Sequence, residues 1–128
     1  RVLDLGCGYG WHCIYAMAHG ASSVAGVDIS HKMLQVAQEK THFPQVEYKC
    51  CAIEDVEFPE ESFDVILSSL AFHYVADYEI LVKKIFRILK SGGKLVFTVE
   101  HPVFTAYGTQ DWHYNENGEI LHFPVDNY

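Results

Sequence analysis

The sequence predicts an α/β fold, a doubly wound and mostly parallel sheet with helices on both faces. Short apolar runs alternate along the chain with segments of helical periodicity, and glycines stand where one kind of segment gives way to the other. Such alternation requires crossover connections, and right-handed crossovers build a doubly wound sheet. The 128 residues, 49% of them hydrophobic, suffice for one core.

Each element follows from a local signal. Five apolar runs are expected to form the strands: residues 2–5, 24–29, 46–50, 63–70 and 94–100. Three segments with apolar residues at helical spacing are expected to form the helices: residues 11–19, 31–40 and 77–91. Ser30 is a suitable N-cap for the second helix, and Gly20 and Gly92-Gly93 are expected to end the first and third helices.

The chain is expected to divide at about residue 100. Residues 1–100 would form the core, and residues 101–128, which lack clear periodicity, would form a loop or flap. The composition of residues 115–119 predicts a turn, with short strands on either side of it. Because Val2-Leu3 places the first strand at the start of the chain, we also expect terminal elements of the fold to be missing.

The charge pattern argues against nucleic acid and membrane partners. The net charge of −8 disfavours phosphate backbones and anionic membrane surfaces. The densest basic group lies near the end of an expected helix, where positive charge is favourable: Lys83, Lys84, Arg87 and Lys90. No apolar run approaches the roughly 20 residues of a membrane helix, and no leader segment is recognisable. A small molecule is the expected partner, whereas the oligomeric state does not follow from the sequence.

The four cysteines indicate a reducing compartment. None stands in a C-x-x-C pair, and adjacent Cys50 and Cys51 could bridge each other only with strain. Cys7, His12 and Cys13 are close in sequence, but their spacing matches no common zinc pattern. We therefore expect buried thiols, no metal and a cytoplasmic location.

A glycine cluster and a later acid mark the expected ligand edge of the sheet. Gly6, Gly8 and Gly10 follow the first strand, so the backbone can turn tightly there and approach a ligand. Asp28 ends the second strand, where a carboxylate can accept hydrogen bonds from both hydroxyls of a ribose. Gly10 follows Gly8 by two residues rather than the three of a dinucleotide fingerprint, which disfavours a nicotinamide cofactor.

These motifs resemble those of the Rossmann-like, class I S-adenosylmethionine-dependent methyltransferases. Residues 2–10, VLDLGCGYG, are similar to the first motif of that superfamily, and residues 26–30, GVDIS, to the second. Residues 54–64 resemble the segment that enters the fourth strand, and residues 89–94, LKSGGK, resemble a turn in which Ser91 replaces proline. The likeness covers the whole expected core and identifies no acceptor.

The resemblance implies a site for S-adenosylmethionine. Asp4 and the backbone of Gly6–Gly8 would hold the methionine moiety, Asp28 would hold the ribose, and Ile29 and Met33 would lie against the adenine. The implied cofactor residues are Asp4, Gly6, Cys7, Gly8, Asp28, Ile29, Met33, Ala52, Ile53, Ser68, Ser69 and Leu70.

Two parts of this implied site are less regular. Ala52-Ile53 stands where many relatives carry an Asp-Ala pair that reads the adenine edge, so only backbone groups are expected to act there. Ser68, Ser69 and Leu70, at the tip of the fourth strand, would line the methionine end.

The catalytic residues are less clearly marked than the cofactor residues. His73 follows the fourth strand and His101 the fifth, so both are candidates to contact the acceptor or to act as a base. For His73 the alternative is a structural role in its loop. Tyr74 would either face the cofactor's sulfonium through a cation–π contact or pack in the core. Trp112 and Tyr114 suggest either a pocket wall or ordinary loop packing.

The sequence thus predicts a methyltransferase that acts on a small molecule. Methyl transfer needs a base only if the nucleophile must lose a proton, which explains why the cofactor pattern is the clearer one. Two alternatives remain open. One is a module that binds S-adenosylmethionine without activity, and the other is an NAD(P)-dependent oxidoreductase, for which no catalytic Tyr/Lys pair can be placed. Sheets of the resembled superfamily usually have seven strands, and five are expected here.

Overall fold

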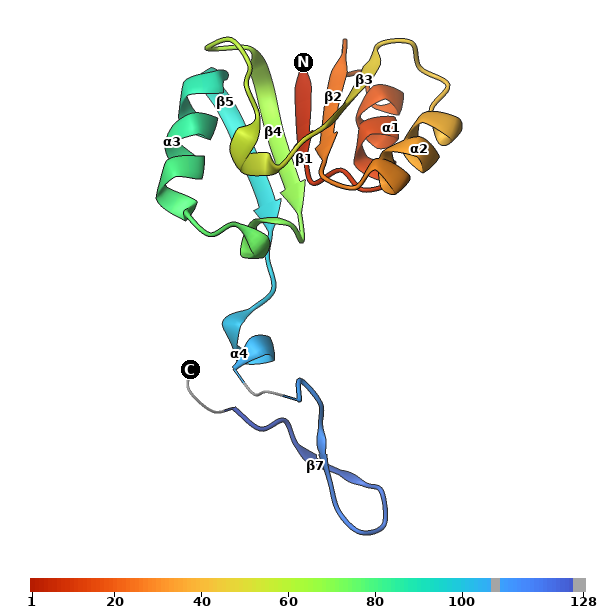
Figure 1. The fold of residues 1–128 in the computed structure, drawn as a ribbon, viewed down its shortest axis with the longest axis vertical. Helices are drawn as coiled ribbons and strands as arrows, with labels where there is room; N and C mark the ends of the chain where they lie inside the picture. The colour runs from red at the N-terminus through yellow and green to blue at the C-terminus, as the bar shows by residue number, and fades with distance from the viewer. Residues whose placement is uncertain (107–108, 126–128) are drawn as a thin grey trace.

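Strands and helices alternate along the chain as the sequence predicts (Figure 1), and the computed structural model describes residues 1–106 and 109–125. The strands are β1 (Val2–Leu5), β2 (Val24–Asp28), β3 (Val46–Cys50), β4 (Phe63–Ser69), β5 (Leu89–Thr98), β6 (His113–Tyr114) and β7 (Ile120–His122). The α-helices are α1 (Trp11–Ala18), α2 (His31–Lys40), α3 (Tyr78–Ile88) and α4 (Pro102–Thr105). Two 3-10 turns follow β3 and β4: η1 (Ile53–Asp55) and η2 (Phe72–Tyr74).

Within the described residues, five parallel strands form the main sheet in the order β3-β2-β1-β4-β5. The chain runs outward from β1 to β3 and then returns past β1 to begin β4 on the other side. Asp4 of β1 accordingly lies beside Gly26 of β2 on one side and Leu67 of β4 on the other. The reversal makes the carboxyl edge between β1 and β4 the topological switch point, where ligands bind in open α/β sheets.

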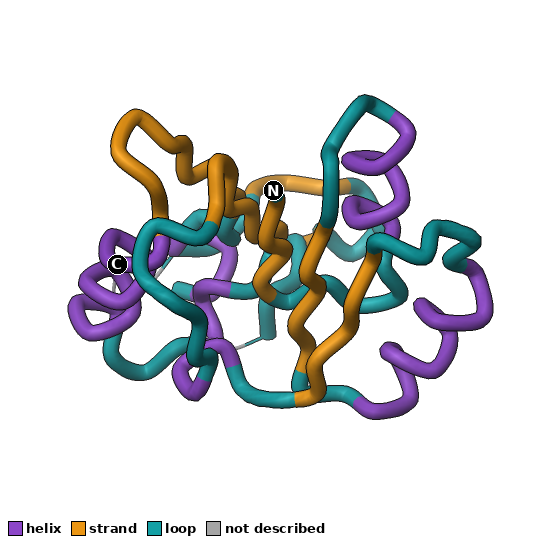
Figure 2. Tube along the Cα trace, turned by 90° about the horizontal axis from the view of Figure 1, so that it is seen from above, coloured by secondary structure: helices purple, strands orange, loops and turns teal. Residues whose placement is uncertain are grey.

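Helices cover both faces of this sheet (Figure 2). α1 and α2 pack on one face, where Cys13 and Leu34 are buried against Val24 of β2. α3 packs on the other face, where its buried side chains, among them Leu81, join Phe63 of β4 in the larger core cluster. The predicted doubly wound α/β architecture is therefore confirmed.

The junction between α3 and β5 differs from the expectation. The sequence predicts a helix that ends at Gly92-Gly93, whereas α3 ends at Ile88 and β5 begins at Leu89. The backbone N–H of Ser62 donates to the carbonyl of Ile88 (2.8 Å), which removes the acceptor that one more helical turn would need. β5 pairs with β4 at Leu89, and regular pairing resumes at Lys94, so the residues between them form a bulge.

The C-terminal part of the chain extends away from the sheet after β5 (Figure 1). β6 and β7 pair antiparallel around the expected turn at residues 115–119, which the N–H of Asn115 closes by donating to the carbonyl of Glu119 (3.0 Å). The Phe123 ring lies 5.4 Å, centroid to centroid, from both Phe104 and Trp112. The extension thus carries a small aromatic cluster of its own.

Residues 107–108 and 126–128 of the expected flap lie outside the described part of the chain. Among the residues that are described, no helix is long and apolar enough to cross a membrane.

Candidate functional site

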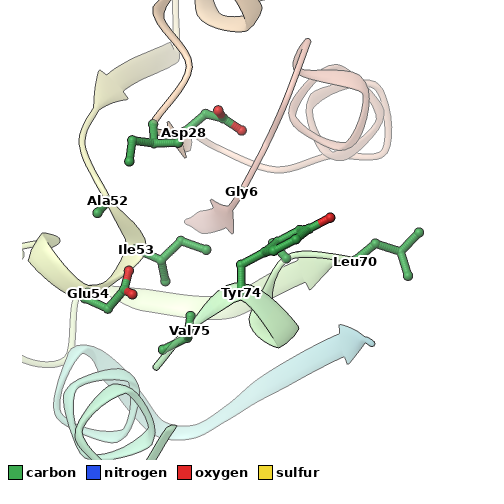
Figure 3. Close-up of a pocket in the computed structure, with 10 residues that line it drawn as sticks. Gly6, Asp28, Ala52, Ile53, Glu54, Leu70, Tyr74 and Val75 are labelled. Atoms are coloured by element: carbon green, nitrogen blue, oxygen red, sulfur yellow. The ribbon is translucent and has the colours of Figure 1, made fainter. Parts of the chain in front are cut away.

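A cavity of about 380 Å³ opens at the carboxyl edge of the sheet, beside the switch point (Figure 3). This volume lies within the range of small-molecule sites. Asp28 reaches the cavity from the β2 side and Tyr74 from the β4 side. The lining residues are Gly6, Asp28, Ile29, Ala52, Ile53, Glu54, Leu70, Ala71, Tyr74 and Val75.

The glycine cluster forms a tight loop between β1 and α1. The N–H groups of Gly6 and Cys7 both donate to the carbonyl of Val27 (2.8 and 2.9 Å), which ties the loop to β2. Gly6, Gly8 and Gly10 have φ values of 78°, 52° and 80°, a region that glycine adopts without strain. A side chain at the first of these positions would also collide with the Cβ of Ala71, so the loop lies directly against the segment after β4.

Asp28 holds this loop from the end of β2. Its Oδ2 accepts a hydrogen bond from the N–H of Gly8 (2.8 Å), and its Oδ1 accepts one from the N–H of Ser30 (2.8 Å). Each carboxylate oxygen has a second lone pair. The carboxylate can therefore receive two further donors, such as the hydroxyls of a ribose, while it keeps its bonds to the loop.

Asp4 is a buried acid behind the loop, with 0% of its surface exposed. Its Oδ1 has no hydrogen-bond partner among the described residues. Its Oδ2 lies 3.6 Å from Cys13 Sγ and 3.8 Å from His12 Nδ1. Burial raises the pKa of Asp4 to about 7, and the nearby Asp28 carboxylate acts in the same direction. A buried oxygen without a hydrogen-bond donor is uncommon in folded proteins.

The implied cofactor residues divide between two cavities. Six of them line the first cavity: Gly6, Asp28, Ile29, Ala52, Ile53 and Leu70. A second cavity of about 290 Å³, between α1 and the strands β4 and β5, is lined by Ser68 and Ser69 together with His12. The remaining implied residues line neither of these cavities: Asp4, Cys7, Gly8 and Met33.

The tip of β4 uses its polar groups internally. The Ser68 hydroxyl donates to the carbonyl of Leu5 (2.7 Å) and is buried, so it fastens β4 to the end of β1. Ser69 Oγ lies 3.2 Å from Thr98 Oγ1 of β5. Leu70 has φ 53°, a strained value for a non-glycine residue, and its N–H donates to the carbonyl of Thr98 (2.9 Å).

Neither catalytic candidate lines the first cavity. His73 Nδ1 accepts the N–H of Glu100 (3.5 Å), and His101 Nδ1 accepts the N–H of Val103 (3.2 Å) at the start of α4. An imidazole that accepts at Nδ1 carries its proton on Nε2 when neutral. Both rings thus hold backbone groups close to the end of β5.

Four lining residues lie outside the implied set: Glu54, Ala71, Tyr74 and Val75. Glu54 closes the side of the cavity beside Ala52-Ile53, where a carboxylate is missing from the sequence pattern. The sequence does not single out Glu54, because several other acidic residues stand in the same loop. Tyr74 is 81% exposed and stands at the cavity rather than in the core. Ala71 and Val75 belong to a loop without any motif.

Among the described residues, no three His, Cys, Asp or Glu side chains are grouped so that they could hold a metal ion. All four cysteines are free thiols, but the expectation that they are buried holds only for Cys7 and Cys13, because Cys50 is exposed and Cys51 is partly exposed. Cys13 is buried and donates toward Asp4, and burial together with the neighbouring Cys7 raises its pKa. It is therefore a protonated, unreactive thiol at neutral pH.

Three comparisons bear on this site. A solved structure from Listeria monocytogenes, assigned as an S-adenosylmethionine-dependent methyltransferase, is 54% identical with a TM-score of 0.93, over 98% of this chain and 57% of that one. A Haemonchus contortus phosphoethanolamine N-methyltransferase 2, solved with S-adenosylhomocysteine, is 33% identical with a TM-score of 0.75, over 86% of this chain and 28% of that one. A ubiquinone biosynthesis O-methyltransferase from Coxiella burnetii is 34% identical over 84% of this chain and 46% of its own length.

The chain spans about half the length of the curated relatives it matches. The model of the methyltransferase domain family matches residues 3–97. This range contains the main sheet except for Val2 of β1 and Thr98 of β5. The resemblance to class I methyltransferases is thereby confirmed: the chain belongs to the methyltransferase domain family.

Proposed function

We propose that this protein transfers a methyl group from S-adenosylmethionine to a small-molecule acceptor. The observation that carries the proposal is the joint position of the glycine loop and the Asp28 carboxylate at one cavity of the switch point. The solved relatives named above depend on S-adenosylmethionine or bind its product, which supports the same cofactor here.

The residues that line the first cavity fit the adenosine end of this cofactor. The first cavity offers the Asp28 carboxylate for the ribose and the exposed side chain of Ile29 for the adenine. Asp4 lies buried behind the glycine loop and lines neither cavity, so its proposed part at the methionine end is to support that loop from behind. Gly6 also lines the first cavity, and because it has no side chain its backbone can approach the ligand closely.

When bound, the cofactor supplies a methyl group on a positively charged sulfur. The contribution of the chain is to orient the acceptor against that group and to exclude water, which can lower a barrier by about 7–11 kcal/mol. Tyr74 stands at the cavity mouth, where an aromatic face attracts a cation. His73 and His101 follow β4 and β5, and we propose them as the residues that contact the acceptor or act as a base.

A small acceptor fits the charge of the chain better than a nucleic acid. The net charge of −8 repels polyanions, and Glu54 adds a carboxylate at the cavity itself. The named relatives act, by their names, at nitrogen and at oxygen, so the family leaves the methylated atom open. The free thiols agree with a reducing compartment, and we propose the cytoplasm.

Calorimetry with S-adenosylmethionine, S-adenosylhomocysteine and NADH tests the proposal. We expect the wild-type protein to bind the two sulfur compounds with micromolar affinity. Asp28→Asn should weaken both by roughly 10–100-fold, because charge-assisted hydrogen bonds to the ribose are lost. The control is Asp64→Asn, which alters an exposed carboxylate at the opposite end of the sheet.

Binding of NADH without either sulfur compound would contradict the proposal. Binding of S-adenosylmethionine without turnover of any acceptor in a screen of small alcohols, amines and thiols would instead favour the inactive binding module. Thermal melts of each variant show whether a lost affinity reflects a lost fold.

A further inference from the structure

Glu54 brings a carboxylate to the wall of the first cavity that the segment after β3 forms. Its side chain lies beside Ile53 and on a different side of the cavity from Asp28 (Figure 3). Lys84 of α3 donates to the backbone carbonyl of Glu54 (2.6 Å) and to the carboxylate of Glu57 (3.3 Å). Within the described part of the chain, no donor pairs with the carboxylate of Glu54 itself, so both of its oxygens are available to a ligand.

The backbone acceptors of the same wall already have donors within the chain. The carbonyl of Ala52 accepts the N–H of Asp55 (3.1 Å). The carbonyl of Ile53 accepts the N–H of Val56 (3.4 Å), and the carbonyl of Glu54 is held from α3 as described above. The side chain of Glu54 is therefore the acceptor that this wall can offer without giving up a bond of its own.

The shape of adenosine matches this arrangement. The exocyclic amine of adenine lies on the edge of the base that is farthest from the ribose, and it carries two N–H donors. A nucleoside whose ribose is held by Asp28 directs that edge away from β2. Glu54 and Tyr74 are the other polar side chains among the described residues of the lining, and Glu54 alone of these two is purely an acceptor.

We propose that Glu54 recognises the exocyclic amine of the cofactor's adenine and so selects adenine over purines that lack a donor at that position. This inference rests on the proposed function, because it requires S-adenosylmethionine or its product in the first cavity. The contact is complementary, since a carboxylate offers only acceptors and the amine offers donors.

The contact has a predictable size. A site that hydrogen-bonds a group of its ligand rejects the analogue without that group, because the polar side chain is then left unpaired. Glu54 is exposed, so water still reaches its carboxylate when the amine is missing. We therefore expect a preference of about tenfold, the lower end for a hydrogen bond to a charged group.

The test compares two ligands by calorimetry: S-adenosylhomocysteine and its 6-desamino analogue, in which hydrogen replaces the amine. The wild type should bind the compound with the amine about tenfold more tightly. In Glu54→Ala this preference should fall below about twofold, because the acceptor is gone. Glu54→Gln keeps one acceptor oxygen without the charge, so its preference should lie between the two.

Asp55→Ala is the matched control. Asp55 is the next residue in the same 3-10 turn, is also exposed and does not line the cavity. This variant should keep the wild-type preference. An equal loss of preference in Asp55→Ala and Glu54→Ala would mean that the charge of the loop, and not a contact with Glu54, decides between the ligands, and would overturn the inference.

The two ligands also separate this inference from the proposed function. If the wild type binds neither compound, the proposed function fails. If it binds both with equal affinity, the proposed function stands and the role of Glu54 is overturned. The same holds if Glu54→Ala weakens both compounds equally, because a residue that only supports the fold of the turn would not distinguish a ligand with the amine from one without it.

Discussion

Single residues at the carboxyl edge combine structural and binding roles. Asp28 holds the glycine loop through Gly8 and also lines the cavity, so a substitution there is expected to alter both the loop and the proposed ligand contact. Asp4 shows the opposite case. Its carboxylate is fully buried and one of its oxygens lacks a hydrogen-bond partner among the described residues, which disfavours the charged form in the folded protein.

The first prediction concerns the stability of Asp4→Asn without ligand. The pKa of Asp4 is raised from 3.8 to about 7 on folding, so the folded protein binds more protons than the unfolded chain between these values. Its contribution to stability is full below about pH 4 and is lost as the pH rises through 7. At pH 8, Asp4→Asn should therefore raise the free energy of unfolding by about 1–3 kcal/mol.

Urea denaturation at pH 8 and pH 4.5 measures this difference. The gain should shrink at the lower pH, where wild-type Asp4 is already neutral. Equal stability of both proteins at pH 8 would show that the carboxylate is better solvated than its burial indicates.

At the scale of elements, the loop between β1 and α1 packs against β3 as well as β2. A Cβ on Gly10 would collide with the hydroxyl of Tyr48 and would lie 3.1 Å from the Cβ of Ala37 in α2. Tyr48 in turn bonds Thr41 through its hydroxyl (2.7 Å), and burial raises its pKa to about 12. The loop thus packs against side chains of β3 and α2.

The second prediction is that Gly10→Ala lowers the free energy of unfolding by about 2–4 kcal/mol, from backbone strain and the collision together. Gly20→Ala is the matched control. It has φ 93°, but a Cβ there meets no atom within 4 Å, so only the strain of about 1 kcal/mol applies. Chemical denaturation of both variants checks the difference, and similar losses would mean that Tyr48 moves aside at little cost.

At the scale of the whole molecule, the ligand edge draws on β1, β2 and the segments after β3 and β4. A ligand that touches all of them stabilises the sheet as a unit. S-adenosylhomocysteine at about 100 times its dissociation constant should add about 2.7 kcal/mol and raise the melting temperature by about 5–10 °C. Calorimetric melts check this. A ligand that binds in titrations but leaves the melting temperature unchanged would have to bind the unfolded chain equally well.

The main sheet and one side of the site were predictable from the sequence. Glycines and strand patterns locate Gly6 and Asp28, because backbone conformation and a strand end decide their positions. The end of α3 was not predictable, since a tertiary hydrogen bond from Ser62 competes with the local helical pattern. Val75 and Glu54 meet the cavity only because loops after two separate strands converge, which no local periodicity records.

The glycine loop is held by hydrogen bonds within the chain itself, to Val27 and to Asp28. The loop is therefore preorganised, and binding of a ligand beside it should need little further ordering of the chain. At a preorganised site, variants of the contact residues usually differ little in association rate, and their affinities differ mainly through the dissociation rate. If Asp28 binds the cofactor as proposed, substitutions around it should change the time for which the cofactor product stays bound rather than the rate at which it binds.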